Sequence, residues 1–462
     1  MLQTRSGVCM TYSSRHLAAA TPVDRDRYVD LLRVVALGVV MIAHFFMVGV
    51  EVTADGAVEV TNTLTVITWA QWLTWVLQVM PVFFAVGGFS NAVAWTSYQR
   101  RGGTYADFMF SRAERLLRPT LVFIVTGLAI GVVVEASGHL DQTAVMVLRV
   151  IAQPLWFIGI YLAVVALAPP MYMLHRRWGW RVLALLVIGT VTVDVLRFGM
   201  DAPAIIGYLN FAFVWLAVHQ CGFFYADRIP ALGNRRAVAG AALGSLLLTM
   251  LLVVWGPYPV SMVTLPGESV SNMTPPSAAL LSLSFWLMGL ALLLRSPTQA
   301  LLGHSSIWRA TIAANGVPMT SFLWHFTVIV SVTGAFVLVG APLFPPIGST
   351  AWWLLRLPLL VLMATVLLGV VMVLRRFERP RPWHIPEVVL RRKHRDAAVA
   401  FGAALALLGI LGFSVAGFAG VLSLRTATLV VVPMAALTSA LILVAGYALM
   451  FWAASPRREA DS

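Results

Sequence analysis

Long apolar segments divide this 462-residue chain, and most have the length that a helix needs to cross a lipid bilayer. About 20 residues suffice, because each helical residue rises about 1.5 Å through a hydrocarbon core about 30 Å thick. Only 11% of the residues are charged, against about 25% in a typical soluble domain. The sequence therefore predicts an all-α, polytopic transmembrane helical bundle of about 12 spans. The segments are 29–50, 64–98, 119–136, 146–172, 180–198, 205–225, 236–255, 277–294, 316–339, 350–374, 397–421 and 426–453.

The segment 64–98 is too long for one straight crossing. Tryptophans at its start and helix-disrupting residues within it predict an interfacial beginning and a broken interior. We count it as one crossing, because two crossings would place every later basic loop outside the cell. The residues concerned are Trp69, Trp72, Trp75, Pro81, Gly87 and Gly88.

The arginines and lysines predict the orientation of the bundle, because short cytoplasmic loops collect basic residues. With the amino terminus inside, basic residues fall in the two tails and the even-numbered loops, and both termini are cytoplasmic. The net charge of +13 is then explained by orientation, and we expect no nucleic-acid partner. The exceptions are Arg33, Arg149, Arg197, Arg356 and Arg425.

The chain divides by composition into tails, membrane segments and one basic linker. The first residues are polar and lack the apolar core of a signal peptide. Cys9 and Cys221 are too few for a disulfide framework or a metal site, so we expect no metal. The expected parts are a cytosolic tail (1–28), a membrane domain of about ten helices (29–382), a basic cytosolic linker (383–396), two additional transmembrane helices (397–453) and a cytosolic tail (454–462).

The first span carries three ionisable residues, Asp30, Arg33 and His44. Such groups are costly in hydrocarbon and indicate a functional site by default. Eleven residues separate Arg33 from His44, which is three turns plus about 20°, so both lie on one helical face about 16 Å apart. One face thus offers a cation and a titratable base. Alternatively, Arg33 snorkels and pairs with Asp30, while His44 only bonds to a neighbouring helix.

Three arginines recur in "FMFSRAERLLRPTL", residues 108–121, at the cytoplasmic start of the third span. Arg112, Arg115 and Arg118 occupy neighbouring positions on the helix, and guanidinium groups bind phosphate oxygens bidentately. They predict a site for a ligand with several phosphates. The alternative is that they only anchor the helix at the inner surface, with Glu114 as a local partner.

The ninth span contains His325 with Ser321 one turn before it. The spacing allows contact between the two side chains, and a Ser-His nucleophile pair is one interpretation. Serines in membrane helices commonly bond back to the carbonyl one turn earlier, so we favour a supporting polar role for His325. Other intramembrane or interfacial candidates, more typical of local pairs and anchors, are Asp194, Arg197, Arg149, His219 and Arg356.

The order of these motifs resembles the membrane-bound acyltransferase 3 family. "YVDLLRVVALGVVMIAH" is similar to the family's first helix, with Asp-x-x-Arg and a histidine eleven residues after the arginine. The resemblance covers residues 28 to 382, and the final two helices fall outside it. Further similar pieces are "MPVFFAVGGFSNA", "SRAERLLRP", "PLWFIGIYL", "TSFLWHF" and "RFERPRPW".

Two positions depart from the family pattern. Gly87 stands where the family usually has serine, which removes a hydroxyl from that point. Pro119 lies one residue late relative to the usual arginine-proline segment. Arg112 and Arg115 remain the best match to the arginine pair of the family.

The resemblance implies O-acyl transfer across a bacterial-type plasma membrane. Acyl-coenzyme A would be the cytoplasmic donor, with no permanently bound cofactor, and the acceptor would be a hydroxyl of an extracytoplasmic glycan, a lipid or an exported small molecule. Arg112 and Arg115, with Arg33, would hold the phosphates of coenzyme A. His44 would be the general base, reached from the arginines by a passage for the pantetheine arm.

Two other classes of protein remain open at this stage. A secondary transporter also has about twelve spans with buried charges, and it is the main alternative. A structural membrane protein is the third interpretation, although it gives no reason to keep costly intramembrane charges. Turnover of acyl-coenzyme A that depends on His44 would separate the three.

Overall fold

A computed structural model describes residues 25–52, 58–340, 343–378 and 394–455. It contains 12 helical segments long and apolar enough to cross a membrane, which confirms the predicted helical bundle and its number of spans. Cys9, most of the expected linker, the end of the "RFERPRPW" motif and nearly all of both tails lie outside the described residues.

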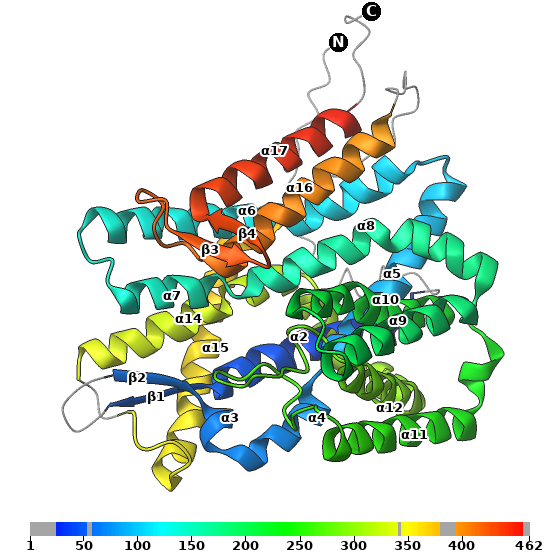
Figure 1. Ribbon diagram of the computed structural model, residues 1–462, viewed down its shortest axis with the longest axis horizontal. Helices are drawn as coiled ribbons and strands as arrows, with labels where there is room; N and C mark the ends of the chain where they lie inside the picture. The colour runs from blue at the N-terminus through cyan, green and yellow to red at the C-terminus, as the bar shows by residue number, and fades with distance from the viewer. Residues whose placement is uncertain (1–24, 53–57, 341–342, 379–393, 456–462) are drawn as a thin grey trace, which may run out of the picture.

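The helices pack into one bundle with α2 near its middle (Figure 1). The α-helices are α2 (Arg27–Met47), α3 (Thr63–Val66), α4 (Thr74–Leu77), α5 (Met80–Arg100), α6 (Tyr105–Ala136), α7 (Gln142–Ala152), α8 (Pro154–Trp178), α9 (Trp180–Gly199), α10 (Asn210–Ala226), α11 (Arg235–Trp255), α12 (Ala278–Leu302), α13 (Ser305–Ala314), α14 (Pro318–Leu338), α15 (Thr350–Glu378), α16 (Arg395–Ala416) and α17 (Ala436–Ala454). Short 3-10 helices are η1 (Thr68–Leu73), η2 (Ala204–Leu209) and η3 (Pro230–Gly233), and the strands are β1 (Val48–Val52), β2 (Val58–Asn62), β3 (Thr426–Leu429) and β4 (Val432–Ala435).

The second span begins with short helices, and it is broken at Gln78 and Val79, between α4 and α5, as the long segment with Pro81 predicted. Pro81 lies in the first turn of α5, where a missing N–H costs nothing. Gly88 lies within the continuous helix, where a Cβ would come 2.0 Å from the His219 carbonyl oxygen of α10. A Cβ on Gly222 would likewise meet the Ala85 carbonyl at 2.0 Å. The expected break is therefore present before Pro81 but not at Gly87 and Gly88, because the glycine at 88 allows α5 and α10 to pack closely within a continuous helix.

Two antiparallel hairpins interrupt the otherwise helical chain. β1 pairs with β2 directly after α2, and β3 pairs with β4 before α17. The expected span 426–453 therefore begins as a hairpin, and the preceding helix ends at Ala416 rather than near 421. Hydropathy does not distinguish a short apolar strand from the end of a helix, which explains both differences.

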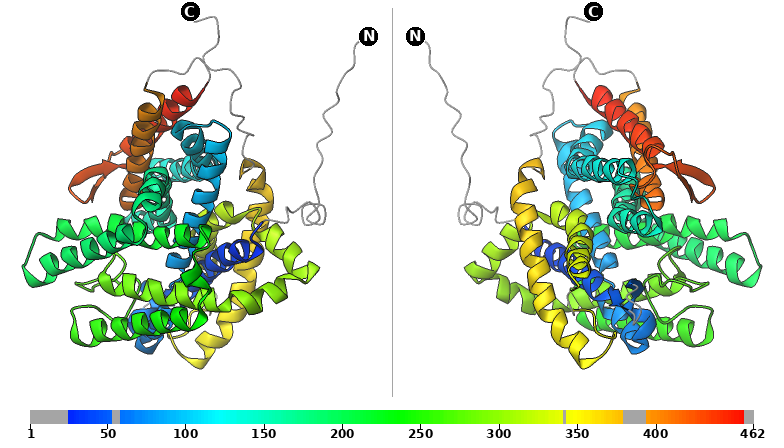
Figure 2. Two further views of the ribbon diagram at one scale, coloured as in Figure 1. Left: turned by 90° about the vertical axis from the view of Figure 1, so that its right-hand side faces the viewer. Right: turned by 90° about the vertical axis from the view of Figure 1, so that its left-hand side faces the viewer.

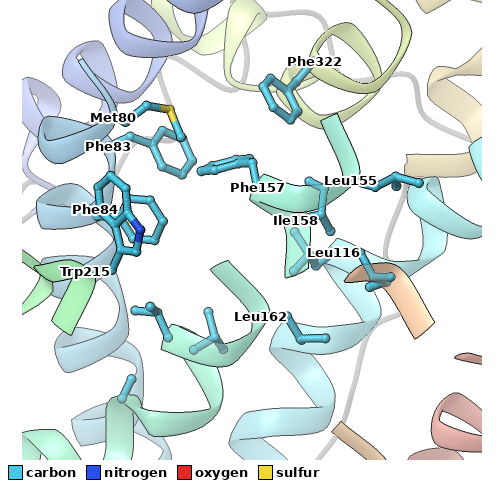
Figure 3. Packing of buried hydrophobic residues seen from close by; sticks show 14 of the residues in the cluster. Met80, Phe83, Phe84, Leu116, Leu155, Phe157, Ile158, Leu162, Trp215 and Phe322 are labelled. Carbon is cyan, nitrogen blue, oxygen red and sulfur yellow. The ribbon is translucent and has the colours of Figure 1, made fainter. Parts of the chain in front are cut away.

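Aromatic side chains connect four helices in the core. Trp215 of α10 stacks on Phe84 of α5 with ring centroids 4.4 Å apart. Phe157 of α8 lies between Phe83, at 5.2 Å, and Phe322 of α14, at 4.9 Å (Figure 3). Each such pair contributes about 0.5–1.5 kcal/mol beyond its burial. This cluster fixes α14 against α5 and α8.

The last two helices pack as a tight pair against α6 and α8 (Figure 2). Glycines let their backbones approach, since a Cβ on Gly402 would come 2.7 Å from the Gly446 carbonyl. Arg395 at the start of α16 donates to Asp107 of α6 at 2.7 Å, and both side chains are buried. The pair thus joins the bundle through close contacts and one buried ion pair.

Candidate functional site

The unbroken helix α2 places Arg33 and His44 on one face. Asp26 caps its start by accepting hydrogen bonds from the backbone N–H groups of Tyr28 and Val29. At 1.5 Å per residue, the two positions lie about 16 Å apart along the axis. The structure therefore gives this face two separate polar sites, one around His44 and one around Arg33.

His44 meets His325 of α14. The distance from His44 Nδ1 to His325 Nε2 is 2.9 Å, and the stacked rings have centroids 5.1 Å apart and an interplanar angle of 10°. His325 is buried, whereas His44 is partly exposed. We call these two residues the histidine pair.

The partners of the histidine pair define its protonation. His325 Nδ1 contacts the Phe322 carbonyl oxygen, and a carbonyl can only accept a hydrogen bond. His325 Nδ1 therefore carries the proton, which leaves Nε2 of a neutral His325 as an acceptor. His44 must then donate from Nδ1, so a neutral His44 has its lone pair on Nε2. The arrangement produces a base at His44 Nε2.

Arg356 of α15 holds the end of α2 beside His44. Its guanidinium donates to the carbonyl oxygens of Phe45, at 3.4 Å, and Val48, at 2.9 Å. The same group lies over the rings of Phe45 and Trp352, at 5.2 and 4.3 Å. Arg356 is thus an anchor, as the sequence predicted for an arginine near the membrane surface. It anchors the end of α2, the helix that carries His44.

Ser321 is directed away from the histidine pair. Its Oγ donates to the Val317 carbonyl at 2.9 Å, one turn earlier in α14. Both nitrogens of His325 already have partners, namely His44 and the Phe322 carbonyl. This arrangement is the backbone-bonded serine that the sequence left open as the alternative to a nucleophile.

A second polar cluster, which we call the arginine site, consists of Asp30, Arg33, Ser90 and Arg112. Arg33 Nη1 pairs with Asp30 Oδ1 at 3.3 Å, and its Nη2 donates to Ser90 Oγ at 2.7 Å. Arg112 Nη2 donates to the Ser90 carbonyl at 2.9 Å. Asp30 also pairs with Arg25, outside this site, at 2.6 Å, so one carboxylate pairs with both Arg33 and Arg25.

The three arginines of α6 differ in their surroundings. Arg112 points inward to Ser90, Arg115 is exposed, and Arg118 is partly exposed. Glu114 accepts a hydrogen bond of 2.6 Å from Tyr447 of α17. The structure therefore brings Arg112 together with Arg33, while Arg115 lies open to the surroundings one turn away.

Ser90 was not identified from the sequence, although it joins Arg33 to Arg112. It follows the "GGF" of the motif in which Gly87 stands where the family usually has serine. A serine hydroxyl three residues after the usual position was therefore the sequence feature that could have identified Ser90. Its neighbour Asn91 contacts His219 Nε2 at 3.1 Å. Asn91 Oδ1 and His219 Nδ1 are buried and have no hydrogen-bond partner among the described residues.

Asp194 anchors the loop 256–277 by hydrogen bonds, at the opposite end of the bundle from the arginine site. It accepts hydrogen bonds from Asn210 at 2.9 Å, Tyr258 at 2.9 Å and the Ala278 N–H at 2.7 Å. Burial raises the pKa of Tyr258, and the nearby Asp194 carboxylate raises it further. Asp194 therefore acts as a structural anchor between α9, α10 and this loop.

Among the described residues, a small cavity beside Phe45 and Arg356 and a larger one among α2, α5 and α9 to α12 are lined neither by the histidine pair nor by Arg33 and Arg112. Neither of these two cavities is the expected passage between the two sites. Within the described residues, no cluster of three or more His, Cys, Asp or Glu side chains could hold a metal ion.

Comparison with known protein families gives a match over most of the chain. A family model described as an acyltransferase domain matches residues 26–376, which include the histidine pair, the arginine site and Arg356. The last two helices lie outside the matched region. No curated protein and no solved structure matches the chain.

Proposed function

The chain belongs to the acyltransferase 3 family, and from this premise we propose that it transfers an acyl group from acyl-coenzyme A to a hydroxyl. The donor would approach from the cytoplasm. The acceptor would be a glycan, a lipid or an exported small molecule at a bacterial-type plasma membrane. The observation that carries the proposal is the 2.9 Å contact between His44 and His325, which favours a free base at His44 Nε2.

In the proposed reaction, His44 Nε2 takes the proton of the acceptor hydroxyl as its oxygen attacks the thioester carbonyl. The carbon–sulfur bond then breaks, an ester forms, and the imidazolium returns the proton to the coenzyme A thiolate. General-base catalysis of this kind accelerates reactions by about 10²–10⁴-fold. His325 is a positioning residue, because its acceptor nitrogen holds the His44 ring in the required tautomer.

The arginine site supports binding of the phosphates of the donor. Arg33 and Arg112 both donate to Ser90, and the adjacent carboxylate of Asp30 is shared with Arg25. This leaves positive charge for phosphate oxygens, which guanidinium groups bind bidentately. Arg115, exposed one turn away, would extend the contact with a long polyanion. The pantetheine arm would span the distance of about 16 Å to His44.

The test is turnover by the purified full-length protein in lipid nanodiscs. We would supply radiolabelled acetyl-coenzyme A with membrane extract as the source of acceptors, and measure free coenzyme A and labelled product. His44→Ala should lower turnover by about 10²-fold or more, because the base is lost. His139→Ala is the matched control, since His139 is exposed and bonds locally to Ser137.

Three outcomes of this experiment are informative. Loss of turnover in His44→Ala with unchanged binding of coenzyme A supports the proposed base. Full turnover in that variant removes His44 from its role. Failure of the wild-type protein to bind coenzyme A would favour the transporter interpretation.

A further inference from the structure

The larger of the two cavities lies among α2, α5, α9, α10, α11 and α12, away from the histidine pair. Its volume is about 670 Å³. An engineered cavity of about 150 Å³ already holds a benzene molecule, so this space is large enough for a substantial ligand. Representative lining residues are Leu32, Phe89, Ala184, Cys221, Ala241 and Phe285.

The wall of the cavity selects an apolar occupant. Five polar side chains reach it: Trp180 is 54% exposed at its edge, and each of the other four already donates its hydrogen to the protein. Tyr28 OH donates to the Ala291 carbonyl at 2.5 Å, and Tyr225 OH to Asp26 at 2.7 Å. The Ser245 hydroxyl and the Cys221 thiol donate to carbonyls one turn earlier in their own helices. Since these side-chain donors are occupied, a hydrocarbon fits this wall better than a polar ligand.

The position and opening of the cavity match one leaflet of a bilayer. On α9 its lining runs from Trp180 to Ile188, a rise of about 12 Å, which is a little less than half of the hydrocarbon core. Trp180 and Ile188 are 54% and 60% exposed, and Ala241 on α11 is also exposed. These exposed apolar residues place an opening of the cavity on the side that faces lipid.

The polar rim at the start of α2 carries an excess of positive charge. It consists of Arg25, Arg27, Arg33, Arg295, Asp26 and Asp30. Arg295 pairs with Asp26 at 3.5 Å and lies 5.5 Å from the centre of the Tyr225 ring, directly beside the lining. Its Nε has no hydrogen-bond partner among the described residues. An anionic head group suits this rim, because basic clusters at a membrane surface attract anionic lipids.

A chain in this cavity is not the acyl group that is transferred. The reacting carbonyl must come within about 3 to 3.5 Å of its partner beside His44. No residue of α14 lines the cavity, and His44 does not line it either. The chain of the occupant is therefore separate from the reacting groups, and its binding in the cavity does not depend on the proposed reaction.

We propose that this cavity is a binding site for an anionic bilayer lipid. One hydrocarbon chain lies between α9, α11 and α12, and the head group rests on the rim at Arg295. The lipid comes from the leaflet at the start of α2.

The test uses photolabelling of the full-length protein in nanodiscs. The probe is phosphatidylglycerol with a diazirine on one acyl chain, compared with the same probe built on phosphatidylcholine. Peptides from α9, α11 and α12 that line the cavity should be labelled. Arg295→Gln should reduce labelling by phosphatidylglycerol about fivefold, the effect of one basic residue near a membrane surface, and leave phosphatidylcholine unchanged.

Matched variants separate the cavity from the general lipid surface. Ala184→Trp fills the cavity and should cut labelling at least fivefold, whereas Leu185→Trp adds the same ring on an exposed neighbour and should not. Ala241→Phe fills the cavity from α11 if the first variant fails to fold. Equal labelling in the filled and control variants would overturn the site. Equal labelling by the two lipids would overturn the anionic head group, and competition by palmitoyl-coenzyme A would assign the cavity to the donor.

Discussion

The two ends of α2 meet their polar partners in different ways. At the start of the helix, Arg33 pairs with Asp30, three residues away in the same helix. Near the end, His44 meets His325 at a separation of 281 residues, and Arg356 holds the adjacent carbonyls from α15. One end is organised largely by local sequence and the other by the tertiary fold.

This difference suggests how the proposed functions are divided. A local ion pair places charge at the membrane boundary, where a polyanionic donor can be captured without precise geometry. A base must be oriented within a fraction of an ångström, and it therefore takes partners from two other helices. Variants at the histidine end should alter turnover, whereas variants at the arginine end should alter affinity.

After the loss expected for His44→Ala, the largest predicted effect is that of removing His325. His325→Ala should lower kcat by about 10- to 100-fold, because His44 loses the acceptor that fixes its tautomer. The KM for acyl-coenzyme A should stay unchanged, since the arginine site is intact. Steady-state kinetics in nanodiscs would measure both constants.

A conservative variant distinguishes this role from a structural one. His325→Gln keeps an acceptor oxygen and should recover part of the activity, whereas a purely structural role predicts equal losses in the two variants. A parallel rise in KM would contradict the division between the two ends of α2.

The next effect concerns donor binding. Arg112→Ala should raise the KM for acyl-coenzyme A about tenfold, since a hydrogen bond to a charged group is worth about 1.5–3 kcal/mol. Arg101→Ala is the control, because Arg101 is exposed and stacks on Tyr98. A change confined to kcat would contradict a role in binding the donor.

The sequence predicts the local half of this comparison well. Apolar length predicts the twelve spans, and helical spacing predicts both the shared face of Arg33 and His44 and the Asp30–Arg33 pair. Each of these properties depends on residues within a few turns of one another. The backbone bond of Ser321 is equally local, and it was anticipated for the same reason.

The histidine pair and the arginine site could not be built from the sequence. Spacing along α2 does not show that α14 brings His325 to His44, because that contact depends on the aromatic packing around Phe157 and Phe322. Similarly, the glycine at 88 suggested a break until its close approach to α10 was visible. Non-local packing determines both the contact between His44 and His325 and the close approach of α5 and α10 at Gly88.

A smaller effect should follow from releasing the end of α2. Arg356→Leu removes two donors to carbonyls beside His44, which should lower kcat by about threefold and stability by about 1–3 kcal/mol. Arg356→Lys keeps the charge but loses the planar fork, so it should recover stability only in part. Turnover and thermal unfolding in the same nanodiscs would test this. Unchanged kcat would show that the orientation of His44 does not depend on Arg356.

The smallest effect is expected at Ser321. Its hydroxyl donates to the Val317 carbonyl in its own helix, so Ser321→Ala removes one local hydrogen bond and leaves the histidine pair intact. Such bonds contribute little to helices, and turnover should stay within about twofold of wild type. A covalent serine mechanism instead predicts nearly complete loss and a labelled acyl-enzyme after brief exposure to acetyl-coenzyme A. Detection of that intermediate would transfer the reacting role from α2 to α14 and reverse the assignment of the two histidines.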